Sequence, residues 1–310
     1  MSFLKLIRYK NLLMLTVMQL IFRYGFLKLQ NIDLALADWQ YALLVLSTVF
    51  IAAGGYVIND IFDQDTDSEN KPNKVIVGKL ISESKAYNVY ALLTICGVAI
   101  GFYLSNVIMR PNFAAIFVLI ASTLYIYATS LKQMLLLGNI VVALLLSSSV
   151  IIIGVFDIFP ATDASNQEVM ATLFSILLDY AIFAFMINLL REIVKDLEDI
   201  DGDFKQGMST LAIVLGVPKT AKLVFALSFI PIIALLIYIN NYLVAHNLIA
   251  ATLYSLVFIL GPMLYFSIKI WTAQSKTDFQ LLSKVLKWIL FFGILSILFI
   301  TLNIKYHASK

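Results

Sequence analysis

The chain has 310 residues, of which 61% are hydrophobic and 13% are charged, and its formal net charge is +3. An ordinary soluble domain is about 45–50% apolar and about 25% charged, so this chain has too little polar surface to cover a water-soluble globule. No run of basic residues in the sequence resembles a nucleic-acid-binding patch, which argues against nucleic acid as a partner.

Apolar runs of about 20 residues, long enough to cross a bilayer as a helix, recur along the chain. We therefore expect an all-α integral membrane protein with nine transmembrane helices, forming a single domain over residues 1–310. In chain order the expected spans cover 11–29, 40–58, 86–106, 113–130, 135–156, 170–190, 221–240, 247–268 and 286–304.

The distribution of lysine and arginine predicts the orientation of these spans, because cytoplasmic segments carry an excess of both. If the N-terminus is cytoplasmic and the nine spans alternate, 17 of the 22 basic residues lie in or beside cytoplasmic segments and four lie on the outer side. We expect a multi-pass protein of the cell (inner) membrane, in contact with membrane lipid.

Acidic residues concentrate in two short segments, both at cytoplasmic ends of expected spans. Five of the 19 lie in 60–69 and six lie in 192–203. The positive-inside rule does not predict this clustering, because acidic residues contribute little to orientation. A single such cluster is equally well explained as a solvated helix end, but two on one side of a chain so poor in charge favour a binding site.

Both clusters share the spacing D-x-x-D-x-x-x-D, and matching positions are 136 residues apart. At about 100° per residue, positions i, i+3 and i+7 fall within about 60° of arc, so each cluster should present three carboxylates on one helical face. The clusters comprise Asp60, Asp63 and Asp67, preceded by Asn59, and Asp196, Asp199 and Asp203.

Carboxylates stacked at helical spacing repel one another, and the C-terminal end of a helix also disfavours anions. Mg²⁺ would offset both costs, since it prefers oxygen ligands and commonly binds carboxylates together with phosphate oxygens. Zinc and soft metals are disfavoured because the only histidines, His246 and His307, fall on the outer side. We expect opposed Asp faces that hold two or more Mg²⁺ ions with a diphosphate between them.

At these residues the sequence resembles the UbiA superfamily of intramembrane prenyltransferases, which carries N-D-x-x-D-x-x-x-D after its second helix and D-x-x-x-D after its sixth. The resemblance extends along nearly the whole chain, and it implies nine helices around a central cavity open to the cytoplasm and laterally to lipid. It also implies the Mg²⁺ ligands, which would be Asn59, Asp60, Asp63, Asp67, Asp196, Asp199 and Asp203.

The same resemblance implies a basic segment after the first motif, N-R-P-x-R-P in the superfamily. Here Lys71 and Lys74 replace both arginines, and Val75 stands at the position of the final proline. Lysine can neutralise a phosphate as a point charge, although it lacks the bidentate geometry of arginine.

The superfamily further carries a tyrosine and a lysine after its fourth helix, which Tyr127 and Lys132 would match. The gap is one residue longer than Y-x-x-x-K, and Tyr125 is an alternative to Tyr127. The residues alone favour a snorkelling anchor for Lys132 and an interfacial position for Tyr127.

Two further sets of polar residues accompany the motifs. Arg191 and Lys195 lie beside the second acidic cluster and could contact the diphosphate or balance local charge. In and just before the first span, four polar residues lie within about 120° of arc and could line an acceptor-binding wall. These residues are Arg8, Asn11, Gln19 and Arg23. Arg23 could instead snorkel to the outer surface.

The resemblance implies Mg²⁺-dependent transfer of a prenyl group, with geranylgeranyl diphosphate as the expected donor and a lipophilic acceptor. The expected catalytic residues are Asp63, Asp67, Asp199, Asp203, Tyr127 and Lys132, and the expected diphosphate-binding residues are Asn59, Lys71, Lys74, Lys132, Arg191 and Lys195.

The second motif in full, REIVKDLEDIDGD, looks like the branch of the superfamily that alkylates geranylgeranylglyceryl phosphate, which makes that lipid the first expectation for the acceptor. Alternatives are an aromatic acceptor for quinone or related biosynthesis, or a terpene cyclase that needs no acceptor. A transporter is disfavoured, because coupling-ion sites in transporters lie near the midplane and these acids lie at the membrane edge.

Overall fold

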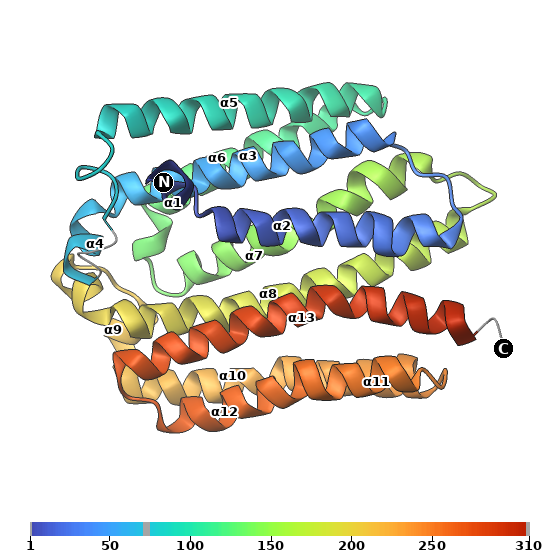
Figure 1. The fold of residues 1–310 in the computed structure, drawn as a ribbon. Coiled ribbons are helices and arrows are strands. Elements are labelled where there is room, and N and C mark those ends of the chain that lie inside the picture. The colour runs from blue at the N-terminus through green and yellow to red at the C-terminus, as the bar shows by residue number, and fades with distance from the viewer. Residues whose placement is uncertain (1, 71–74, 308–310) are drawn as a thin grey trace.

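In the computed structural model, which describes residues 2–70 and 75–307, helices run side by side as one bundle (Figure 1). Within those ranges, nine helical segments are long and apolar enough to cross a membrane, which confirms the expected fold class. They are Tyr9–Gln30, Asp38–Phe62, Glu83–Val107, Pro111–Thr129, Leu137–Ala161, Gln167–Lys205, Val217–Val244, Ile249–Thr272 and Lys276–Lys305.

Several spans contain a short π-helical or 3₁₀ stretch, so that one span comprises more than one element. The main helices are α2 (Tyr9–Leu20), α3 (Asp38–Phe62), α5 (Glu83–Val107), α6 (Ala114–Thr129), α7 (Leu137–Ile153), α8 (Gln167–Lys205), α10 (Val217–Tyr238), α11 (Ile249–Ser255), α12 (Gly261–Thr272) and α13 (Lys276–His307).

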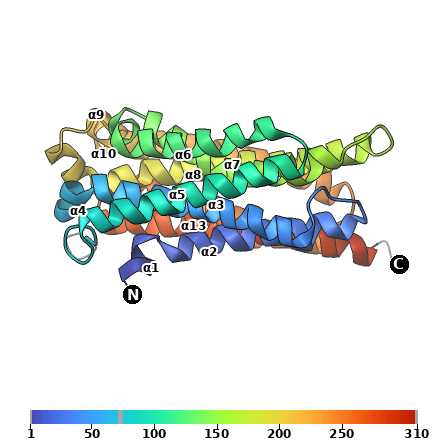
Figure 2. The same cartoon turned by 90° about the horizontal axis from the view of Figure 1, so that it is seen from above.

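Three short helices lie at one end of the bundle, the end that also carries the N-terminus (Figures 1 and 2). They are α1 (Ser2–Leu6), α4 (Gln64–Asn70) and α9 (Leu211–Leu215). The C-terminal end of α13 lies at the opposite end, as an odd number of crossings requires.

The two acidic clusters are carried in different ways. Helix α8 has 39 residues and continues without a break to Lys205, so the second cluster is helical throughout. Helix α3 ends at Phe62, Asp63 has the non-helical angles φ −96° and ψ 7°, and α4 begins at Gln64. The expectation of three first-cluster carboxylates on a single continuous helix is therefore corrected, because the helix breaks in the middle of that cluster.

Close helix contacts in the bundle rely on small residues, as is usual where lipid surrounds the protein. Between α3 and α5, a Cβ added to Gly97 would lie 2.7 Å from a side-chain carbon of Ile51. Across the same contact, the Ser47 hydroxyl donates a hydrogen bond of 2.7 Å to the main-chain oxygen of Gly97. Many large apolar side chains remain exposed, including Leu92, Ile95 and Ile268, which suits an outer surface facing hydrocarbon.

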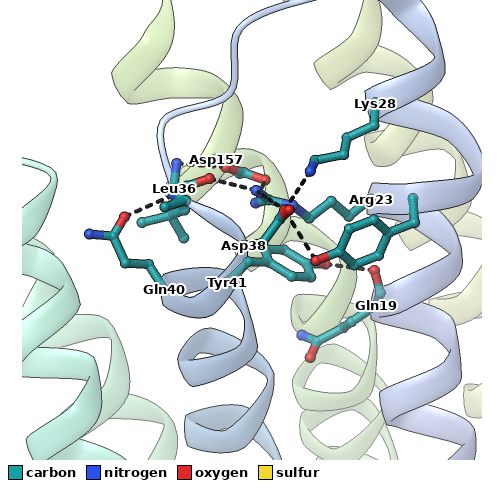
Figure 3. Close-up of polar contacts among 10 residues, drawn as sticks. Gln19, Arg23, Lys28, Leu36, Asp38, Gln40, Tyr41 and Asp157 are labelled. Atoms are coloured by element: carbon teal, nitrogen blue, oxygen red, sulfur yellow. Dashed lines mark hydrogen bonds and ion pairs between the residues drawn. The ribbon is translucent and has the colours of Figure 1, made fainter.

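At the end opposite α4, a buried ion pair joins two π-helical stretches, η1 (Ile21–Phe26) and η5 (Gly154–Ile158) (Figure 3). The guanidinium of Arg23 donates to Asp157, and both side chains are at most 1% exposed. Arg23 also donates to the main-chain oxygen of Leu36 at 2.5 Å, and the ring of Tyr41 lies 4.3 Å from its guanidinium carbon. The network ties the first, second and fifth spans together at this end.

Candidate active site

A cavity of about 350 Å³ lies among α2, α3, α4, α6, α7 and α8, at the end of the bundle that carries the short helices. Both acidic clusters contribute to its wall, so carboxylates 136 residues apart in sequence face one space. Ten of the predicted site residues line it: Asn59, Asp63, Asp67, Tyr127, Lys132, Arg191, Lys195, Asp196, Asp199 and Asp203.

Asp63 is held at the break between α3 and α4 by two partners. The Asn59 amide, one turn earlier, donates a hydrogen bond to one carboxylate oxygen, and the Lys132 ammonium forms an ion pair with the other. Lys132 is 8% exposed and follows the end of α6, so it points into the cavity rather than outward to the membrane surface. The structure thus places Lys132 beside the first motif, and its expected role in binding diphosphate stays a prediction.

Asp60 is placed differently from the other acids of its cluster. Its carboxylate accepts a hydrogen bond of 2.8 Å from Arg8, whose guanidinium also lies 5.0 Å from the ring of Tyr56. Burial acts to lower the pKa of Arg8, but Asp60, Tyr56 and Asp63 together outweigh burial and raise that pKa above its ordinary value. Asp60 therefore contributes to the site through Arg8, which lines the cavity. The expected role of Asp60 as a metal ligand stays a prediction.

The second cluster projects from the last turns of α8. Asp196 accepts a hydrogen bond of 2.9 Å from the side-chain amide of Asn139 in α7. Glu192, one turn earlier, accepts hydrogen bonds from Lys195 at 2.6 Å and from Arg191 at 3.3 Å. No role was predicted for Asn139 or Glu192. Lys195 and Arg191, which were expected to bind diphosphate, both form hydrogen bonds with Glu192 here.

Asn70 connects the two clusters. Its side-chain amide donates a hydrogen bond of 2.9 Å to the main-chain oxygen of Asp199 and accepts one of 2.9 Å from the main-chain N–H of Gly202. Its own main-chain oxygen accepts a hydrogen bond of 3.0 Å from Lys276 of α13. An exposed ion pair of 2.5 Å between Glu69 and Lys205 adds a further link between α4 and α8.

The two candidate tyrosines of α6 have different surroundings. Tyr127 lines the cavity, and the charges of Glu192, Asp63 and Asp196 act on its hydroxyl. Tyr125 is 43% exposed, and its ring packs on those of Tyr90 and Phe62. Tyr127 is therefore the tyrosine that faces the acids. Lys71 and Lys74 lie outside the described residues.

The deeper wall of the cavity is mainly apolar. It is formed by Leu15, Ile51, Phe117, Ile120, Leu124, Val142, Leu145 and Leu146. A space with charged groups at one end and hydrocarbon side chains beyond them suits an amphiphile with an anionic head group.

The side chains that face the cavity suit Mg²⁺ by their chemistry. Within the described ranges, no three His, Cys, Asp or Glu side chains form a compact group that could hold a metal ion. The carboxylate and amide side chains that face the cavity nonetheless offer hard oxygen atoms, which suit Mg²⁺ bound through one or two carboxylates and substrate phosphates. In addition, Oδ1 of Asn59 is buried and has no hydrogen-bond partner among the described residues. The chemistry of the site thus fits a magnesium–diphosphate complex shared between the two clusters.

Comparison with known proteins agrees with this geometry. Residues 26–301 match the model of the UbiA prenyltransferase family. A digeranylgeranylglyceryl phosphate synthase of Sulfurisphaera tokodaii is 34% identical over 197 residues, covering 61% of this chain and 64% of that protein. The chain thus spans a little under two thirds of that relative's length.

Two solved structures share the fold. One comes from work on the biosynthesis of digeranylgeranylglyceryl phosphate synthase in membranes. The match covers 98% of both chains, with a TM-score of 0.64 and 25% identity. The other is a UbiA homologue from Archaeoglobus fulgidus bound to DMAPP and Mg²⁺; it covers 96% of this chain and 99% of its own, with a TM-score of 0.60 and 17% identity.

Proposed function

Because this chain belongs to the UbiA prenyltransferase family, we propose that it transfers a prenyl group from its diphosphate to a lipophilic acceptor. We take geranylgeranyl diphosphate as the donor and geranylgeranylglyceryl phosphate as the acceptor. The proposal rests on one observation above all: both acidic clusters line the same cavity, which continues into an apolar wall. The name of the Sulfurisphaera tokodaii relative supports the choice of acceptor.

We assign the donor's diphosphate to the charged end of the cavity. Bound Mg²⁺ would neutralise charge on the leaving group, with Asn59, Asp63 and Asp67 as ligands on one side and Asp196, Asp199 and Asp203 on the other. Lys132, together with Lys195 and Arg191, would donate hydrogen bonds to diphosphate oxygens and stabilise the same charge.

In the transfer step, Tyr127 and the apolar wall act on the prenyl group. The C1–O bond of the donor breaks with its electron pair leaving on the diphosphate, and the acceptor's hydroxyl oxygen bonds to C1 and releases its proton to the departing diphosphate. The ring of Tyr127 would stabilise positive charge that develops at C1. The apolar wall would hold the prenyl chain and exclude water, which would otherwise hydrolyse the reactive carbon.

The proposed setting is the inner cell membrane, with the cavity on the cytoplasmic face and a lateral path to lipid. The excess of lysine and arginine on one side of the spans supports that orientation. We also propose that residues 1–310 act as one domain, because the family match extends over most of the chain and the cavity draws on its N-terminal and central parts.

The direct test is a transfer assay with purified enzyme, labelled geranylgeranyl diphosphate and Mg²⁺, with products identified by mass spectrometry. Its arms contain geranylgeranylglyceryl phosphate, an aromatic acceptor, or no acceptor. We expect the ether product only in the first arm, and a loss of about 10²- to 10³-fold in kcat for Asp63→Asn and for Asp199→Asn.

Asp65→Asn is the control, because Asp65 is an exposed acid of α4, two residues after Asp63, and its replacement should leave turnover unchanged. Full activity in Asp63→Asn or Asp199→Asn would contradict the proposed mechanism. A cyclic hydrocarbon formed from the donor alone would replace the transferase with a cyclase.

A further inference from the structure

A second, smaller cavity of about 130 Å³ lies between α2, α8 and α13. It adjoins the active-site cavity, since several residues line both, among them Asn11, Leu15 and Arg191. Figures 1 and 2 show α2 and α13 running along α8 at this side of the bundle. We call this space the side chamber. A group bound in it would lie next to the acids without occupying the space between them.

One end of the side chamber is cationic. Lys287 of α13 lines it and donates a hydrogen bond of 2.7 Å to the side-chain oxygen of Asn11 in α2. An ammonium group has three donors, and this bond uses one of them. Arg191 reaches the same space, and its Nε is buried without a hydrogen-bond partner among the described residues. The chamber therefore offers hydrogen-bond donors and positive charge to an anionic group.

The rest of the side chamber is mainly apolar. Met18 and Phe22 of the first span face it from one side, and Phe183, Leu290 and Ile294 face it from α8 and α13. The combination suits a lipid with a single-chain tail and a phosphate-bearing head, and the adjoining acids mark where such a lipid would react.

The depth of Lys287 agrees with a lipid head group. It lies at the start of the apolar stretch of α13, where the hydrophobic core of a membrane begins. A lysine at this depth could simply snorkel to the surface. Its side chain is instead directed across the chamber to Asn11, and a charged side chain that faces a cavity at membrane depth usually serves a function.

We infer that the side chamber binds the phosphate-bearing acceptor, and that Lys287, with Asn11, selects an anionic acceptor over an uncharged one. This inference rests on the proposed function. The donor's diphosphate then occupies the space between the acidic clusters, the acceptor's phosphate lies at Lys287, and the acceptor's hydroxyl reaches the junction of the two cavities.

The test compares steady-state kinetics of the wild type, Lys287→Gln, Lys287→Arg and Lys284→Gln. Lys284 is the matched control, because it is an exposed lysine almost one turn earlier on the same helix. Each variant is assayed with geranylgeranylglyceryl phosphate and with the same lipid lacking its phosphate, at varied concentrations of acceptor and of geranylgeranyl diphosphate.

For Lys287→Gln we expect the KM for the phosphate-bearing acceptor to rise by about tenfold to a hundredfold, the range that corresponds to loss of a charge-assisted hydrogen bond. The KM for the donor should stay within about twofold of the wild type, and the preference for the phosphate-bearing over the uncharged acceptor should shrink by a similar factor. Lys287→Arg should recover most of that preference, and Lys284→Gln should match the wild type.

Two outcomes would overturn the inference while leaving the proposed function intact. One is an unchanged acceptor preference in Lys287→Gln, and the other is a raised KM for the donor instead of the acceptor, which would place Lys287 on the diphosphate. Failure of the proposed function is a different result, in which the wild type transfers no prenyl group to any acceptor. An unchanged KM for the donor also shows that Lys287→Gln is folded.

Discussion

Gly202 of α8 lies directly against the side chain of Asn70 in α4: a Cβ added to the glycine would be 2.3 Å from Nδ2 of the asparagine. The same amide is hydrogen-bonded to the main chain of α8 at both Asp199 and Gly202. The distance between the two acidic clusters therefore depends on the absence of a side chain at position 202.

Gly202→Ala should force α4 away from α8. In a helix without such a contact, this change stabilises by about 1 kcal/mol, whereas here a methyl group has no room unless Asn70 moves. We expect the KM for the donor to rise about tenfold, equivalent to about 1.4 kcal/mol, together with a lower melting temperature in detergent. Gly261→Ala is the control, because its nearest contact is at 3.4 Å. Wild-type kinetics with a raised melting temperature in Gly202→Ala would refute this account.

Replacing each tyrosine of α6 should separate their roles. Tyr127→Leu removes an aromatic ring from the cavity, and loss of a cation–π contact of about 0.5–2 kcal/mol should lower kcat roughly twofold to thirtyfold. Tyr125→Leu removes an exposed ring of similar size from the same helix and should leave kcat within about twofold of the wild type. Equal losses of kcat in both variants would mean that the ring facing the acids has no special role.

The buried pair at the opposite end of the bundle should matter for stability. Asp157→Asn leaves the guanidinium of Arg23 buried without its counter-charge, a change that typically costs about 3–5 kcal/mol. Thermal unfolding in detergent should show a clearly lower midpoint for Asp157→Asn than for Asp38→Asn, whose carboxylate is 60% exposed. Replacing both partners by apolar residues, as in Arg23→Met with Asp157→Leu, should restore most of the loss. A midpoint of Asp157→Asn equal to the wild type would show that the pair contributes little.

Removing divalent metal should stop the reaction. We expect EDTA to abolish transfer and added Mg²⁺ to restore it, because opposed carboxylates need cations before a diphosphate can bind between them. Asn59→Ala removes a buried side-chain oxygen without a partner among the described residues. It should raise the Mg²⁺ concentration for half-maximal activity while leaving the KM for the acceptor unchanged. A full rate in EDTA would exclude a metal requirement.

The sequence predicted the spans well because their length is set by the thickness of the bilayer, and that thickness is the same for every helix. The apolar run of the sixth span was expected to end at residue 190, and the helix continues to Lys205, as the helical spacing of the second cluster predicted. Apolarity stops at the first charged residues of that span, whereas main-chain hydrogen bonding continues through them. The break at Asp63 was not predicted, because the spacing D-x-x-D-x-x-x-D is compatible both with one helix and with two helices joined at Asp63.

The motif spacing identified most of the residues that line the cavity, but it did not identify the residues that hold them in place by hydrogen bonds. Asn139 and Asn70 act on residues 57 and 129 positions away, and no local pattern in the sequence marks such pairs. Asp157 fell in an expected outer loop, where an acid is unremarkable, and only the packing of the first and fifth spans shows it to be buried. The roles proposed for the ten cavity-lining residues stay predictions until variants are measured.

The uneven way in which the acids are carried has a mechanical consequence. Helix α8 is one continuous rod through its cluster, while the other cluster is divided between the end of α3 and the short helix α4. Because α4 is separate from α3, we expect any change in the gap between the clusters to come from movement of α4 about Asp63, with the hydrogen bonds of Asn70 to α8 broken and the shape of α8 unchanged. Spin labels on α4 and α8 would report that movement as a change in distance when the donor binds, and labels along α8 alone would report none.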